Sequence, residues 1–145
     1  MSEKVYYTEG EKPVSQMGAA LESLFATIEE RRSAGEKSYT YRLLNGSPDT
    51  VLKKVMEEAG EVALAAKDVE AAAAGSGDAA ARDAAVDHLR YEAGDVVYHL
   101  LVALARYGVT LDEFAAELNS RMTEDAIAKR HGVAMLKPEH VKRGK

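Results

Sequence analysis

The chain has 145 residues, of which 46% are apolar, and it carries a formal net charge of -5 and no cysteine. This length suits one folded domain, and the acidic charge argues against a protein that works mainly on nucleic-acid backbones. Disulfides, thiolate nucleophiles and cysteine-bound zinc are excluded, so any metal must be held by oxygen or histidine. There is no apolar run of about eighteen residues and no signal-peptide pattern, so we expect a cytoplasmic protein without a membrane partner.

Hydrophobic periodicity predicts one helical domain with a leader and a tail. Residues 1–14 are expected to be a flexible leader, residues 15–130 the helical domain, and residues 131–145 a C-terminal tail. No strand pattern competes with the helical spacing. The expected fold class is therefore all-α, a bundle of four to five helices.

The first helix is expected over residues 15–34, where Gly35 ends it. The following segment, EKSYTYRLLNGS, is rich in Tyr and Thr and closes with Asn-Gly. It is expected to be an irregular loop or a brief helical turn. Its two leucines, Leu43 and Leu44, should tuck under the bundle.

A second helix is expected from Ser47-Pro48, where the serine would cap the helix and the proline suits its first position, to about Asp68. The stretch AAAAGSGDAAARD that follows predicts a loop or a frayed helix end. The expected core-facing stripe of the second helix is formed by Val51, Leu52, Val55, Met56, Ala59, Val62 and Ala63.

The third helix has the strongest period in the chain, from Val86 to Leu104, and is expected to end at Gly108 and to be the most buried. Thr110 and Glu113 form a capping-box pattern that opens a fourth helix. That helix is expected to run through Met122 toward residue 130.

Two similar acidic stretches stand out: EAGE at Glu58–Glu61 and EAGD at Glu92–Asp95. Helical spacing stacks the two acids of each stretch one turn apart on one face. Antiparallel packing of the second and third helices would bring all four acids together, with Glu57 beside them. Such a cluster repels itself unless a cation or protons compensate it.

Hard carboxylate ligands favour Mg²⁺, with Mn²⁺ as the alternative. Magnesium commonly joins carboxylates to substrate phosphates, so a diphosphate-cleaving site is one interpretation, with Lys53 and Lys54 adding positive charge for phosphate oxygens. The other interpretation is a solvated acidic face, which is common on helices. Gly60 and Gly94, at equivalent places inside helices, need a packing or functional reason.

Three segments together resemble the phosphoribosyl-ATP pyrophosphohydrolase family, which belongs to the all-α MazG-like nucleotide pyrophosphohydrolases. They are KSYTYRLLNGSPDTVLKKVMEEAGEVALAAKD, YEAGDVVYHLLVAL and YGVTLDEFAAEL. The family pattern has a Ser-Tyr-Thr entry, a Lys-x-x-Glu-Glu-x-x-Glu helix, and Glu-x-x-Asp followed by Tyr-His. The chain departs from the pattern at Met56 and in a longer Ala-rich connection.

The resemblance implies hydrolysis of the α–β phosphate bond of phosphoribosyl-ATP, which yields phosphoribosyl-AMP and pyrophosphate in the second step of histidine biosynthesis. It implies that the magnesium ligands are Glu58, Glu61, Glu92 and Asp95. Glu57, Glu58 and Glu61 are the catalytic candidates, and Glu57 is an added ligand or the carboxylate that orients the attacking water. The resemblance also suggests a helical oligomer, and we expect a homodimer.

The candidate substrate-binding residues are Lys54, Lys53, Tyr39, Arg42 and His99. A buried histidine that bonds a neighbour is an equal alternative for His99, and core packing is an equal alternative for the tyrosines. Two competing functions remain: a (d)NTP pyrophosphohydrolase with the same metal cluster, and a non-catalytic helical module whose acidic face binds a basic partner.

Overall fold

The computed structural model describes residues 17–75 and 77–122, and these residues contain helices and no strand. The all-α prediction is confirmed. The expected leader and tail, residues 1–14 and 131–145, lie outside the described residues. The helices are α1 (Met17–Glu30), the short 3-10 helix η1 (Arg31–Ser33), α2 (Tyr39–Asn45), α3 (Pro48–Ala74), α4 (Ala79–Arg106) and α5 (Leu111–Asn119).

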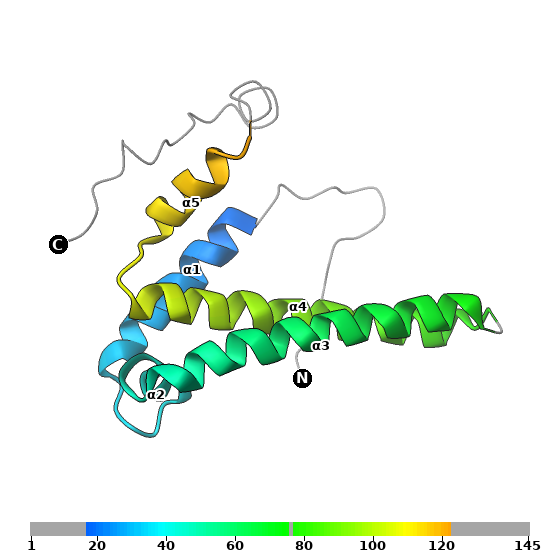
Figure 1. The fold of residues 1–145 in the computed structure, drawn as a ribbon, viewed down its shortest axis with the longest axis horizontal. Helices are drawn as coiled ribbons and strands as arrows, with labels where there is room; N and C mark the ends of the chain where they lie inside the picture. The colour runs from blue at the N-terminus through cyan, green and yellow to red at the C-terminus, as the bar shows by residue number, and fades with distance from the viewer. Residues whose placement is uncertain (1–16, 76, 123–145) are drawn as a thin grey trace.

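Helices α3 and α4 form a long antiparallel hairpin, and the other helices gather around one end of it (Figure 1). α1 packs on α4, and α2 packs on both α3 and α4. The opposite half of the hairpin extends beyond them (Figure 1). No helix in the two described ranges is long and apolar enough to cross a membrane.

The chain between α1 and α3 is more regular than expected. α1 ends at Glu30, and η1 carries the chain to Gly35, whose φ of +85° lies in the left-handed region. The segment expected to be an irregular loop or a brief helical turn forms the seven-residue helix α2, so the helical alternative is the closer one. Its cap is Ser38, whose side chain accepts a hydrogen bond from the Tyr41 amide at 3.3 Å.

The hairpin is also longer than expected, because the Ala-rich stretch is mostly helical. α3 continues past Asp68 to Ala74, and α4 begins again at Ala79. Alanine has the highest helix propensity, so the alanine runs extend both helices. The connection is confined to the short glycine-containing segment between them.

The two predicted helix-start signals behave differently. At α5, the Thr110 side chain accepts the Glu113 amide at 3.1 Å, and the Glu113 carboxylate accepts the Thr110 amide at 2.8 Å, so the capping box is confirmed. Ser47 does precede Pro48 at the start of α3, but its side chain makes no capping bond. α5 ends at Asn119, earlier than the end near residue 130 that was expected.

The core lies where α1, α2 and the start of α3 cover the C-terminal half of α4. α4 contributes six buried residues, most of them in its C-terminal half, although its N-terminal part is exposed, and Leu43 and Leu44 are buried as predicted. The buried apolar residues of this cluster are Ile28, Leu43, Leu44, Val51, Leu101, Val102, Ala103 and Ala105. Such burial, at about 25 cal/mol per Å² of apolar surface, is what fixes the helices around α4.

The predicted core-facing stripe of α3 is wrong in part. Leu52 and Met56 are 42% and 78% exposed, whereas α3 buries Val51, Glu58 and Ala65. The reason is that α4 covers one side of α3, whereas α1 packs on α4 and does not cover the other side of α3. Among residues 17–75 and 77–122, the outer face of α3 is therefore uncovered.

Candidate active site

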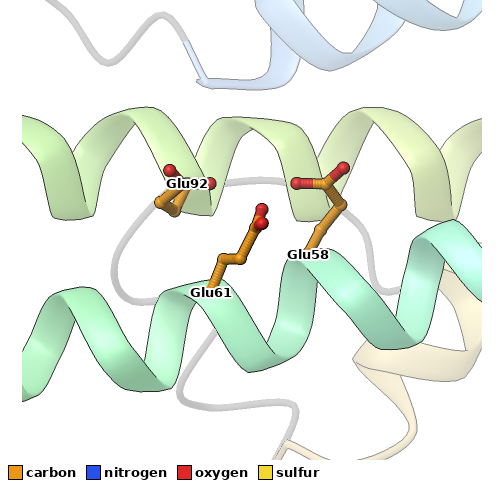
Figure 2. Close-up of side chains that lie close together, drawn as sticks. All are labelled: Glu58, Glu61 and Glu92. Atoms are coloured by element: carbon orange, nitrogen blue, oxygen red, sulfur yellow. The ribbon is translucent and has the colours of Figure 1, made fainter.

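Three carboxylates meet between α3 and α4. Glu58 and Glu61 extend from α3 toward α4, which carries Glu92 (Figure 2). One oxygen from each lies within 4.8 Å of the others, and Glu58 and Glu92 are only 4% and 7% exposed, whereas Glu61 is open to solvent. The antiparallel packing predicted from the repeated acidic stretches therefore brings three of the four acids together.

The other predicted acids lie at the edge of this cluster. Asp95, one turn after Glu92 on α4, is half-buried and is not part of the closely spaced group. Burial, followed by the charge of Glu58, raises the pKa of Asp95. Glu57 is exposed on α3 and lies 3.4 Å from the Lys54 ammonium.

Lys54 supplies the main positive charge at the cluster. Its Nζ lies 2.7 Å from Glu58 Oε1, and this hydrogen bond holds the pKa of Lys54 above its usual range. The same bond is the main reason that the pKa of Glu58 is lowered despite burial. One lysine cannot balance the cluster, so a second cation is electrostatically favoured.

The pKa of Glu61 is raised by its acidic neighbours. A hydrogen bond to Glu58 is the main cause that raises the pKa of Glu61, and the charges of Glu58 and Glu92 act in the same direction. A divalent cation bound by these carboxylates would relieve the same repulsion.

The acid cluster fits a hard divalent cation. Its donors are carboxylate oxygens only, and ligands about 2.1 Å from Mg²⁺ lie about 3.0 Å apart when adjacent and about 4.2 Å apart when opposite. The three acid oxygens lie within 4.8 Å of one another, so they would have to move closer together to bind one ion. Small side-chain rotations would therefore let Glu58, Glu61 and Glu92 hold one Mg²⁺ or Mn²⁺ ion.

His88 is a site residue that the sequence reasoning missed. Its Nε2 lies 2.8 Å from Glu92 Oε1, and the ring is about half exposed. The signal was present in the sequence, because His88 precedes Glu92 by four residues and therefore lies on the same helix face.

Two of the predicted substrate-binding residues contact each other. His99 is 5% exposed, and its Nε2 lies 3.0 Å from the Tyr39 hydroxyl. The alternative of a buried histidine bonded to a neighbour is thus confirmed. Arg42 lies near this pair, with its guanidinium carbon 5.9 Å from the centre of the Tyr39 ring.

Lys53 and Arg42, the remaining predicted binding residues, are not among the residues that contact Glu58, Glu61 and Glu92. Lys53 is exposed and makes no ion pair with any acid in the described ranges. Arg42 donates to the carbonyl oxygens of Glu36 and Lys37 at 2.8 and 3.3 Å. It also borders an open cavity of about 570 Å³ at the start of α3, which is lined by Glu36, Tyr41, Arg42, Asn45, Gly46, Ser47 and Thr50.

Relatives of this chain are found among enzymes. It is 42% identical over 113 residues to a phosphoribosyl-ATP pyrophosphatase of Paracidovorax citrulli, an alignment that covers 75% of this chain and 74% of the relative. A phosphoribosyl-ATP pyrophosphatase of Acidovorax sp. is 42% identical over 118 residues, or 79% of this chain and 80% of the relative.

A longer relative carries two activities in one chain. The histidine biosynthesis bifunctional protein HisIE of Thermus thermophilus is 39% identical over 114 residues, which is 78% of this chain and 45% of the relative. This chain therefore spans less than half of that protein. No solved structure gave a significant match.

The family comparison covers all the helices around the acid cluster. The model of the phosphoribosyl-ATP pyrophosphohydrolase family matches residues 20–122, which include Glu58, Glu61, Glu92 and Asp95. This match takes in more than half of the chain, and the relatives agree with it. The chain belongs to the phosphoribosyl-ATP pyrophosphohydrolase family.

Proposed function

We propose that this protein hydrolyses the α–β phosphate bond of phosphoribosyl-ATP and releases phosphoribosyl-AMP and pyrophosphate, the second step of histidine biosynthesis. Family membership supports the substrate, and one structural observation supports the chemistry: oxygens of Glu58, Glu61 and Glu92, from two helices, lie within 4.8 Å of one another. Such a group suits a cation that contacts a polyphosphate.

The proposed cofactor is Mg²⁺, with Mn²⁺ as a substitute. Glu58, Glu61 and Glu92 would hold it, and Asp95 would reach it after a side-chain rotation or would hold a second ion. When bound, the ion would offset charge on the phosphate oxygens and lower the cost of attack by water.

The roles of orienting the water and contacting the phosphates are assigned to side chains of the protein. Glu57 is exposed beside the cluster and would orient the attacking water or add a ligand. Hydrolysis forms a bond from the water oxygen to phosphorus, breaks the bond to the bridging oxygen, and leaves the water proton on a carboxylate. We expect Lys54 to contact a phosphate oxygen, because its ammonium lies 2.7 Å from Glu58 Oε1, beside the proposed cation site.

The nucleotide would lie across α2 and the start of α3. Arg42 and Tyr39 lie on α2, and Arg42 borders the open cavity there. We propose that Arg42 and Lys53 contact the phosphoribosyl or adenosine part of the substrate. Tyr39 and His99 were also expected to bind substrate, but burial of His99 limits its access to a ligand.

The nearest rival is a (d)NTP pyrophosphohydrolase with the same metal cluster. Purified protein with Mg²⁺ should be given phosphoribosyl-ATP and, separately, a panel of dNTPs. We expect kcat/KM for phosphoribosyl-ATP to exceed that for any dNTP by about 100-fold, as expected for a site that bonds to the extra ribose phosphate. Cleavage of the dNTPs alone would refute the proposed substrate.

A non-catalytic acidic module is the other rival. It predicts salt-sensitive association with a basic partner and no metal binding. Calorimetry with Mg²⁺ and Mn²⁺ in the presence of a nonhydrolysable nucleotide separates the two. A lack of metal binding would support the binding module over either enzyme.

We further propose that the protein is a homodimer that acts in the cytoplasm and does not bind nucleic acid. The exposed Leu52 and Met56 on α3 support an additional helix contact. The location rests on the proposed metabolic substrate and not on a feature of the fold.

A further inference from the structure

The imidazole of His99 is held by groups on different sides. Its Nδ1 lies 2.8 Å from the backbone oxygen of Asp95, and its Nε2 lies 3.0 Å from the Tyr39 hydroxyl. The Tyr98 ring meets it edge-on, with centroids 4.9 Å apart and planes at 75°. A carbonyl oxygen can only accept, so Nδ1 carries a hydrogen, and in the neutral ring Nε2 accepts from Tyr39.

The held ring lies against a proposed metal ligand. His99 Nδ1 is 3.7 Å from Glu58 Oε1, and the two side chains are 6% and 5% exposed. This separation is too long for a hydrogen bond but places the N–H edge of the ring against the carboxylate. Together with Lys54, the ring limits the positions that Glu58 can adopt.

Helix α2 connects this arrangement to the fold. Besides Tyr39, its next residue Thr40 bonds to α4, with Oγ1 2.7 Å from the Tyr98 hydroxyl. His99 and Tyr98 of α4 are thus each hydrogen-bonded to a residue in the first turn of α2. The partner of His99 is Tyr39, and the partner of Tyr98 is Thr40. The Ser38 side chain caps the start of α2 and so helps to hold this first turn in place.

We propose that Tyr39 and His99 are positioning residues: the Tyr39 hydroxyl fixes the His99 ring, and the ring fixes the Glu58 carboxylate for the cation. This inference rests on the proposed function, because it takes Glu58 as a metal ligand. It assigns both residues an indirect role in place of direct contact with substrate. Outer partners that orient a metal ligand are typically worth about 10–100-fold in metal affinity or activity.

The first test measures metal binding without substrate. Mn²⁺ affinity should be determined by calorimetry for the unsubstituted protein, Tyr39→Phe and His99→Gln. We expect each variant to bind Mn²⁺ about tenfold more weakly. Tyr107→Phe is the matched control, because Tyr107 is 58% exposed at the end of α4, and it should bind Mn²⁺ normally.

The second test is a double-mutant cycle. Tyr39 acts through His99 in this proposal, so Tyr39→Phe should weaken Mn²⁺ binding in the unsubstituted protein but add little to His99→Gln. Thermal unfolding of each variant shows whether the fold is intact. A folded variant with weak metal binding separates positioning from a general loss of structure.

Four results would contradict this proposal or the proposed function. Unchanged Mn²⁺ affinity in folded Tyr39→Phe with a raised KM for phosphoribosyl-ATP would show direct substrate contact and overturn the proposal. Additive losses in the cycle would also overturn it. If the unsubstituted protein binds no Mn²⁺, both this proposal and the proposed function fail, whereas metal binding without hydrolysis of phosphoribosyl-ATP refutes the function alone.

Discussion

Glu61 is the acid of the cluster that is least compensated by positive charge. Glu58 is paired with Lys54 at 2.7 Å, and Glu92 with His88 at 2.8 Å. Glu61 forms no ion pair with a basic residue in the described parts of the chain, and its main partner is Glu58 itself. It is therefore the position where a charge can be removed at least cost to the fold.

We predict that Glu61→Gln abolishes turnover with little loss of stability. The amide removes a metal ligand but relieves repulsion at an exposed site, so the free energy of unfolding should stay within about 0.5 kcal/mol. Turnover should fall by more than about 100-fold, because even outer partners of ligands are worth 10–100-fold.

The control for this variant is Glu70→Gln on the same helix, where the side chain is 68% exposed and paired with Lys67. It should retain normal turnover, with both rates measured by pyrophosphate release. A near-normal rate in Glu61→Gln would remove Glu61 from the site.

The sequence predicted much of the cluster because helical spacing relates residue number to position. Glu58, Glu61 and Glu92 follow from the repeated acidic stretches and antiparallel packing. Asp95 does not join these three acids, because side-chain rotations decide which carboxylates meet and helical spacing does not specify those rotations. The contact between Tyr39 and His99 joins residues 60 positions apart, so local pattern could not predict it.

At the scale of elements, the start signals were predicted better than the ends. Thr110 forms a full capping box, whereas Ser47 occupies the cap position of α3 without a side-chain bond. The Ala-rich stretch was misjudged because its low complexity suggested a linker, while helix propensity favours continuation. The outer face of α3 was misjudged because periodicity shows an apolar face but not which neighbour covers it.

The two cap residues make a matched prediction. Thr110→Ala should destabilise α5 by about 1 kcal/mol, because it removes the oxygen that accepts the Glu113 amide. Ser47→Ala should change the stability of α3 by no more than a few tenths of a kcal/mol. Native-state hydrogen exchange reports each helix separately, and equal effects at the two caps would contradict the observed bonding.

Gly60 offers a test of function within a helix. A Cβ built at Gly60 or at Gly94 meets nothing within 4 Å, so packing within the chain does not require either glycine. Gly60→Ala should therefore stabilise the folded chain by about 1 kcal/mol. We predict that it also lowers turnover, because the added methyl blocks close approach to the backbone beside Glu61.

Gly18→Ala on α1 is the control, since a Cβ there also meets nothing within 4 Å. It should leave turnover unchanged. Thermal unfolding and pyrophosphate release measure the two effects. If Gly60→Ala is more stable and fully active, the glycine has no functional role.

At the scale of the whole molecule, the bare face of α3 predicts assembly. Leu52, Met56 and Leu64 are 42%, 78% and 68% exposed on a helix that, among the described residues, packs mainly against α4 and near its start against α2. We predict a homodimer, with a mass by light scattering of twice the 15.7 kDa of the chain. Met56→Lys should shift the protein toward monomer, because it places a charge on the apolar face.

A matched control for that variant is Met17→Lys, which places the same charge on a 65% exposed methionine of α1, away from this face, and should leave the mass unchanged. A stable monomer of the unsubstituted protein at micromolar concentration would show the dimer prediction to be wrong.

The central claim is that the carboxylates between α3 and α4 support cleavage of one particular bond in phosphoribosyl-ATP. Phosphorus NMR of a reaction with Mg²⁺ follows every phosphate of the substrate at once. Equal amounts of pyrophosphate and phosphoribosyl-AMP should appear, and chelation of the metal should stop the reaction. Release of orthophosphate with phosphoribosyl-ADP, or an unchanged substrate spectrum, would contradict the account.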